Sequence, residues 1–320
     1  MDTGRLPCII AVKPWFQDHI FNDKIVLPAV EGMLQLAAHV AAAYPGININ
    51  VMEDACFAKF LEIAPDAASL STLIECSAHP DDRVQAKLLS RSQFKAMSRI
   101  KEHCKIFFSR AVPDSIHNSP RINFSAGPPT ARGIKVKVDY LYRKLVPFGP
   151  SYRTLQEALH LFEHEAWGKL RAPRFPVCSN DAIQKTIGSP FPLDGALHAA
   201  CVLGQQTVDF VPFPVGFRRR TVLRPTQPGS SYITRVRQTP CLDGELNFDL
   251  AIWDDGGQLY ETVDGLRMRD VSSVLKKNRD KLAVVGPGEQ LLHGNSGQPA
   301  QQDERIHCPG QVHAKEKNQV

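Results

Sequence analysis

Two residues far apart in the chain, His19 and Asp194, have side chains suited to acid–base chemistry. A neutral imidazole can accept a proton near pH 7, and a carboxylic acid kept protonated by burial can donate one. His19 falls in a loop before an expected apolar helix, and Asp194 falls at the start of another. Helix N-termini carry free N–H groups that favour an oxygen becoming negative. The two residues are therefore a candidate base and acid facing each other across a cleft between two halves.

Each of these residues also has an ordinary structural explanation. A lone histidine in a loop is most often structural, and an aspartate before a helix is most often its N-cap. Residue type and spacing alone therefore leave both explanations open for His19 and for Asp194.

The elements that would position the pair follow one order twice: a loop, an apolar helix and several strands. Apolar residues at steps of three and four predict a helix from residue 29, with Pro28 in its first turn and Pro45-Gly46 ending it. A second helix, GALHAACVLGQQ, follows an expected loop at 187–194. Short runs after each helix predict antiparallel strands. The pattern predicts an α+β fold in which two antiparallel sheets each wrap a long helix.

Composition divides the chain into four segments. Residues 1–112 and 132–272 hold the two copies of the plan. Residues 113–131 are rich in Pro, Ser and Asn, which is typical of a linker. Residues 273–320 are polar with little periodicity, which predicts a flexible tail.

The bulk composition is that of a globular protein, and we expect a cytoplasmic one. A net charge of +5 is too small to indicate nucleic acid. The longest helical apolar stretch, residues 28–43, is interrupted by Glu31, Gln35 and His39 and is too short to span a bilayer. The eight cysteines show no C-x-x-C spacing, which favours buried reduced thiols over a zinc site. We expect no metal, no membrane and no nucleic acid.

Three short motifs follow one another in the chain. His19 to Pro28 fits H-x-x-x-G-x-x-x-x-P in its first and last residues, FGPSY at 148–152 is similar to Y-G-P-x-F, and DGALH at 194–198 fits D-x-x-x-Q/H. In this order the motifs resemble those of the polyketide synthase dehydratase family. The similarity extends over residues 10–272 and includes VPFPVGF at 211–217 and VDGLRMRD at 263–270. The resemblance implies a double hotdog fold.

The resemblance also implies a function, the removal of water from a carrier-bound 3-hydroxyacyl thioester to give a 2-enoyl thioester in polyketide or fatty-acid biosynthesis. In that family the histidine, here His19, removes the α-proton, and the aspartate, here Asp194, protonates the departing hydroxyl. His198, one helical turn from Asp194, would orient it, with Gly149 and Pro28 in support. No cofactor is needed. The implied partner is an acyl carrier protein with its phosphopantetheine-linked substrate, and family members often form homodimers.

Two positions depart from the family's pattern. Asp23 stands where the family has glycine; aspartate tolerates a positive φ better than most residues, and its charge would raise the pKa of His19. Phe148 replaces a tyrosine and lacks its hydroxyl, while Tyr152 stands where phenylalanine is usual. The acid and base are kept, so we expect effects on efficiency and substrate positioning.

Two further groups of residues invite a functional interpretation. An arginine cluster, Arg218, Arg219, Arg220 and Arg224, is either a solvated strand end or a dock for an acidic carrier protein or its pantetheine phosphate. The sequence His160-LFE-His164 matches the H-x-x-E-H of zinc peptidases. That motif needs a helix, whereas these residues alternate like a strand, so we interpret the match as chance.

Two other functions fit the same motifs. A product-template-like cyclase uses a similar His/Asp pair and fold for aldol ring closure. A catalytically silent double hotdog would only organise an assembly line. An assay for loss of water from a 3-hydroxyacyl thioester separates the dehydratase from both.

Overall fold

The computed structural model describes residues 4–94, 97–109, 133–175, 181–240 and 245–271. Residues Met1–Ser273 cluster as one unit, distinct from Val274–Val320. The expected linker at 113–131 and the tail beyond 273 lie outside the described residues. Within the described ranges, no helix is both long and apolar enough to cross a bilayer.

The first half contains one long helix and most of its strands follow that helix. Its elements are β1 (Arg5–Ala11), a 3-10 turn η1 (Pro14–Asp18), β2 (Ile20–Phe21), β3 (Lys24–Val26), α1 (Ala29–Ala43), β4 (Asn48–Phe57), β5 (Glu62–Ile63), β6 (Ser69–Ala78), β7 (Arg83–Phe94) and β8 (Met97–Ser109). The helix predicted from residue 29 is confirmed, and Pro28, fixed near φ −59°, stands directly before it.

The second half repeats the plan with additional short helices. Its elements are β9 (Ile134–Lys137), α2 (Val138–Tyr140), η3 (Leu141–Leu145), η4 (Pro150–Tyr152), β10 (Leu155–Leu161), β11 (Glu165–Arg171), α3 (Asp181–Ile187), α4 (Pro190–Gly204), β12 (Phe213–Val222), β13 (Ser231–Thr239), β14 (Leu246–Trp253) and β15 (Leu259–Arg269). The prediction of a loop at 187–194 is wrong for most of these residues. The helix α4 already begins at Pro190, where a proline without an N–H costs no hydrogen bond.

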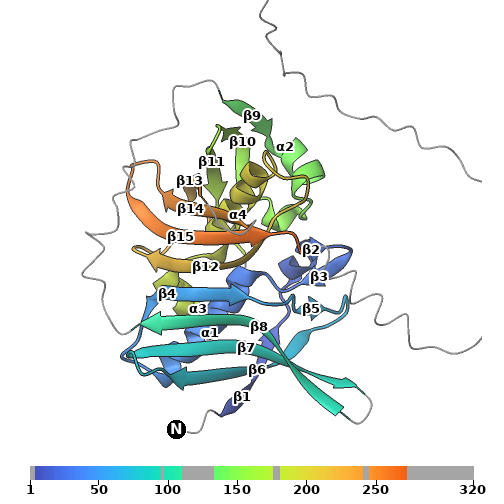
Figure 1. Cartoon of the computed structure of the whole chain (residues 1–320), viewed down its shortest axis with the longest axis vertical. Helices are drawn as coiled ribbons and strands as arrows, with labels where there is room; N and C mark the ends of the chain where they lie inside the picture. The colour runs from blue at the N-terminus through green and yellow to red at the C-terminus, as the bar shows by residue number, and fades with distance from the viewer. Residues whose placement is uncertain (1–3, 95–96, 110–132, 176–180, 241–244, 272–320) are drawn as a thin grey trace, which may run out of the picture. The chain divides into compact units, whose positions relative to one another are not determined.

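The strands form one continuous antiparallel sheet in the order β1-β6-β7-β8-β4-β12-β15-β14-β13-β11-β10-β9. The two predicted sheets are therefore joined edge to edge through β4 and β12, which lie side by side in Figure 1. At this seam Gly216 pairs with Cys56, and a Cβ on Gly216 would overlap the carbonyl oxygen of Ala55. Glycine is thus required for the close approach of the two strands. A separate small sheet, β2-β3-β5, lies beside the first half.

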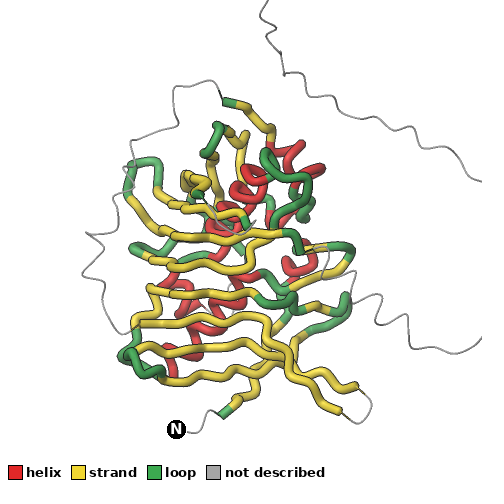
Figure 2. The backbone as a smooth tube through the Cα atoms, in the orientation of Figure 1, coloured by secondary structure: helices red, strands yellow, loops and turns green. Residues whose placement is uncertain are grey.

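Both long helices pack on the same face of this sheet, as Figure 2 shows. Helix α1 contacts β4, β7 and β8, helix α4 contacts β11, β13 and β14, and the two helices touch each other. Every residue of α4 is buried, which explains why it is apolar on all sides. The arrangement confirms the expected double hotdog α+β class.

Candidate active site

The hairpin between β2 and β3 fixes the position of His19. The backbone N–H of His19 donates to the Phe16 carbonyl at 3.0 Å, and that of Val26 donates to the His19 carbonyl at 3.1 Å. The hairpin turns through Asn22 and Asp23, at φ 47° and 60°. Asp23 thus adopts the positive φ that aspartate tolerates better than most residues. Because Val26 returns beside His19, its carbonyl lies 3.0 Å from Nδ1 of the imidazole.

Gly149 anchors the FGPSY turn to the residue before His19. The N–H of Gly149 donates to the Asp18 carbonyl at 2.8 Å, and that of Ser151 donates to Asp18 Oδ2 at 2.9 Å. A Cβ on Gly149 would overlap the Asp18 side chain, so only glycine allows this contact. The turn consequently holds the Phe148 ring stacked on His19, with centroids 4.6 Å apart.

Helix α4 supplies Asp194 and His198, both only 4% exposed. Asp194 Oδ2 lies 3.1 Å from His198 Nε2, one helical turn away. These two atoms are close but not aligned for a hydrogen bond, and neither has another partner. Contrary to expectation, Asp194 is the fifth residue of α4 rather than its N-cap, because the helix starts at Pro190.

The other nitrogen of His198 is bonded to Tyr142. The Tyr142 hydroxyl accepts the Leu155 N–H at 3.0 Å and lies 3.3 Å from His198 Nδ1. Since the hydroxyl accepts from Leu155, its own hydrogen is available for Nδ1. When the hydroxyl donates to Nδ1, the proton of a neutral His198 is on Nε2, the atom that faces Asp194.

His19, from the first half, and Asp194, from the second, belong to one electrostatic site. Burial of the imidazole lowers the pKa of His19, the carboxylate of Asp194 opposes this shift, and His198 lowers the pKa further. The expectation that Asp23 raises the pKa of His19 is wrong, because desolvation dominates and the opposing carboxylate is Asp194. His19 is therefore neutral near pH 7. With Nδ1–H directed at the Val26 carbonyl, its Nε2 is left as a proton acceptor.

Phe148 links the two histidines of the site. Its ring stacks on His19 at 4.6 Å and on His198 at 4.8 Å, with interplanar angles of 13° and 26°. Tyr152 adds an edge contact to His19 at 5.0 Å. The aromatic side chains thus pack against both imidazoles and hold them in place.

The predicted arginine cluster is divided between different environments. Arg220 is 3% exposed, and its Nε lies 2.6 Å from Glu261 Oε1 inside the core. Its assignment to a carrier-binding surface is wrong, because β12 turns this side chain inward. Arg219 lies 3.9 Å from Glu53, whereas Arg218 and Arg224 are exposed.

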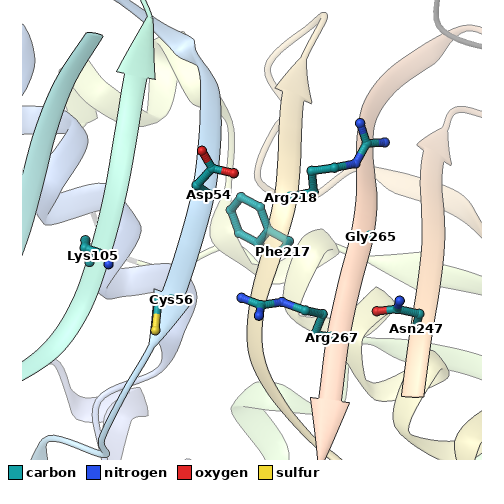
Figure 3. A pocket seen from close by; sticks show the side chains of 8 residues that line it. All are labelled: Asp54, Cys56, Lys105, Phe217, Arg218, Asn247, Gly265 and Arg267. Carbon is teal, nitrogen blue, oxygen red and sulfur yellow. The ribbon is translucent and has the colours of Figure 1, made fainter. Parts of the chain in front are cut away.

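A hollow of about 570 Å³ lies on the sheet across the seam of the two halves (Figure 3). Its lining residues are Asp54, Cys56, Lys105, Phe217, Arg218, Asn247, Gly265 and Arg267. It contains neither His19 nor Asp194 and is distinct from the acid–base site. Sequence reasoning missed Lys105 and Arg267, because only strand pairing brings them near Arg218.

The H-x-x-E-H residues lie away from both places. His160 is in β10, while Glu163 and His164 lie beyond its end and are largely exposed. Neither the strand nor the turn gives the helical spacing that a zinc peptidase requires.

Comparison with known proteins agrees with this fold. Residues 128–278 match the family model described as "Polyketide synthase dehydratase N-terminal domain". Over this segment the chain is similar to the polyketide synthase dehydratase family. No curated protein matches the chain.

Solved structures of dehydratase domains share the fold of the whole described chain. A bifunctional dehydratase-cyclase domain in ambruticin biosynthesis is 18% identical, with 86% of this chain and 93% of that chain covered and a TM-score of 0.65. The dehydratase domain from the CurJ module of Curacin polyketide synthase is 16% identical, with 84% and 92% covered and a TM-score of 0.63. The dehydratase domain of RzxB from Pseudomonas fluorescens is 18% identical, with 78% and 87% covered and a TM-score of 0.59. These likenesses establish the double hotdog fold.

The contact between Gly149 and Asp18 can be tested by adding one methyl group. We expect Gly149→Ala to lower the free energy of unfolding by about 1–3 kcal/mol, because the new Cβ forces the FGPSY turn away from Asp18. Gly46→Ala is the control, since no atom lies within 4 Å of a Cβ at that position. Urea unfolding of both variants is the measurement. Equal stability of the two would contradict the close contact at Gly149.

Proposed function

We propose that this protein is a 3-hydroxyacyl-[acyl carrier protein] dehydratase, with His19 as the base and Asp194 as the acid. The observation that carries the proposal is the meeting of a neutral, desolvated imidazole from one half with a buried carboxyl group from the other. The family match over residues 128–278 and the dehydratase domains of the same fold support it.

The base step uses Nε2 of His19. Its lone pair takes the α-proton of the thioester, and the electrons of the C–H bond move into the thioester carbonyl as an enolate. The imidazolium that forms keeps its Nδ1–H bond to the Val26 carbonyl, which stabilises the positive charge.

The acid step uses the carboxyl group of Asp194. It gives a proton to the β-hydroxyl while the C–O bond breaks, and the enolate electrons form the new double bond, so water and a 2-enoyl thioester leave. His198 Nε2–H, 3.1 Å from Asp194 Oδ2, is placed to steady the carboxylate that remains. His198 is therefore a positioning residue in this scheme.

Replacement of His19 tests the base. We expect His19→Ala to lower kcat/KM for water loss by about 10²–10⁴. In the wild-type protein the acidic limb of the kcat/KM profile, where His19 becomes protonated, should lie below pH 6.5, because the pKa of His19 is lowered from that value and the base must be neutral. Ultraviolet detection of the enoyl thioester follows the reaction, and product analysis separates it from ring closure. His79→Ala, at an exposed histidine, is the control. Normal turnover by folded His19→Ala would remove this residue from the mechanism.

The carrier partner is part of the proposal, and the hollow of Figure 3 is where we place its contact. Three cations, Lys105, Arg218 and Arg267, line the hollow against one carboxylate, Asp54. An acidic carrier surface would complement this charge, which favours encounter and docking more than the chemical step.

Charge reversal tests this contact. We expect the double variant Lys105→Glu, Arg218→Glu to raise KM for the carrier-bound substrate by about tenfold through lost charge pairing. The same acyl group on free pantetheine should be used at the wild-type rate. Lys185→Glu, a charge reversal at an exposed residue of α3, is the control for net charge. Steady-state kinetics with both substrates is the measurement, and an equal loss with both would assign the cations a structural role.

The cellular setting and the pairing of copies complete the proposal. We place the protein in the cytoplasm, which the free thiols of Cys8, Cys104 and Cys201 support, since oxidising compartments favour disulfides. Burial raises the pKa of Cys201 to about 12, as expected of an unreactive core thiol.

Homodimer formation is supported by the edge strand β1, which exposes Leu6 and Ile9.

A further inference from the structure

A buried ion pair that the proposed mechanism does not use lies near the site. Lys13 Nζ and Glu31 Oε2 are 2.8 Å apart, and the two side chains are 7% and 1% exposed. Lys13 precedes η1, and Glu31 is in the first turn of α1. Burying two charges is costly unless their remaining hydrogen-bonding atoms are also satisfied. The second oxygen, Glu31 Oε1, is buried and has no partner.

Two neighbouring donors are unpartnered in the same way. Trp15 Nε1 and the Tyr152 hydroxyl are buried without hydrogen bonds. Lys13 Nζ lies 5.4 Å from the Trp15 ring, which places that ring beside the ion pair. Phe191 joins the two aromatic side chains, with centroids 6.5 Å from Trp15 and 5.4 Å from Tyr152. Native proteins leave few buried polar atoms unsatisfied, and three such atoms lie in this one neighbourhood.

This neighbourhood adjoins the acid–base pair. Tyr152 packs edge-on against His19 at 5.0 Å. Burial raises the pKa of Tyr152, and the charges of Glu31 and then Asp194 raise it further, so its hydroxyl lies within the fields of both carboxyl groups. Tyr152 therefore connects the reacting centre to the ion pair.

We propose that Glu31, Trp15 and Tyr152 form a polar subsite for an oxygen-bearing group, a hydroxyl above all, on the acyl chain beyond its reacting carbons. A hydroxyl can donate to Glu31 Oε1 and accept from the Trp15 N–H or the Tyr152 O–H, which matches one acceptor with two donors. Lys13 keeps Glu31 ionised and in position through its 2.8 Å contact.

The depth of these residues determines which end of the substrate they meet. The thioester remains attached to its carrier through an arm that must reach the solvent. Glu31 and Tyr152 are each only 1% exposed, so the distal acyl chain, not the arm, lies against them. The inference rests on the proposed function for the identity of the substrate, although binding to the subsite can be measured without turnover.

Calorimetric binding of unreactive analogues tests the subsite. The analogues are acyl-pantetheine thioesters without a 3-hydroxyl, either saturated or with one hydroxyl at a single more distal carbon. We expect at least one hydroxylated analogue to bind the wild-type protein about tenfold more tightly than the unsubstituted chain, because it satisfies buried groups that are otherwise unpaired. Tyr152→Phe and Glu31→Gln should each remove most of this preference. Tyr260→Phe, at a tyrosine that stacks on Tyr232 instead, should keep it.

Tyr152→Phe should fold as the wild-type protein does, because the hydroxyl group that it removes makes no hydrogen bond. A loss of binding preference in this variant therefore does not reflect misfolding. Equal binding of all analogues to the wild-type protein, or a preference that persists in both Tyr152→Phe and Glu31→Gln, overturns the subsite. Water loss from a carrier-bound 3-hydroxyacyl thioester is assayed separately. Preferential binding of a hydroxylated analogue without water loss would support the subsite and contradict the proposed function. Water loss without any binding preference would support the proposed function and overturn the subsite.

Discussion

The pairing of β4 with β12 is the contact on which the rest of the structure depends. It makes one sheet out of two, and a continuous sheet places α1 and α4 against each other on the same face. Arg220 reinforces the seam from inside: its Nε bonds Glu261, and Nη1 lies 3.6 Å from the sulfur of Met52 on β4. A buried ion pair of this kind tolerates little displacement, because separating the partners would leave a desolvated charge.

The chemistry of the site follows from this geometry. The first half contributes His19 and the second contributes Asp194 and His198, with aromatic side chains packed against the two imidazoles. Burial keeps His19 neutral, which a base requires, and the buried Asp194 carboxyl is, in our proposal, the group that gives a proton to the departing hydroxyl. The same apolar surroundings explain why Phe148 can replace a tyrosine. Its ring supports His19 and His198 by stacking, and stacking needs no hydroxyl.

Much of the fold could be predicted from the sequence, because local pattern determines it. The apolar stripe from residue 29 predicted the helix that the structure places at Ala29–Ala43. The positive φ of Asp23 could also be anticipated from a family pattern with glycine there. The start of α4 was missed, because PFPLD has two prolines and resembles a loop. Proline is in fact tolerated in the first turn, so the helix includes Asp194.

What could not be predicted depends on contacts between distant strands and helices. Nothing local distinguishes buried Arg220 from exposed Arg218 two residues earlier. In the sequence Glu31 is only a polar interruption of an apolar stretch. In the structure its ion pair with Lys13 allows the side chain to be buried in the core. The residues that the motifs single out, His19, Gly149, Asp194 and His198, lie in one site, and their catalytic roles stay proposals.

The central claim is that His19 and Asp194 divide two proton transfers between them. The most direct measurement compares water loss with exchange of the α-proton for deuterium in Asp194→Asn, using a 3-hydroxyacyl thioester in D₂O. The account predicts that water loss falls by about 10²–10⁴, since the amide cannot supply the proton, while His19 continues to exchange the α-proton. Water loss at close to the wild-type rate in Asp194→Asn would contradict the account and leave only the base assigned.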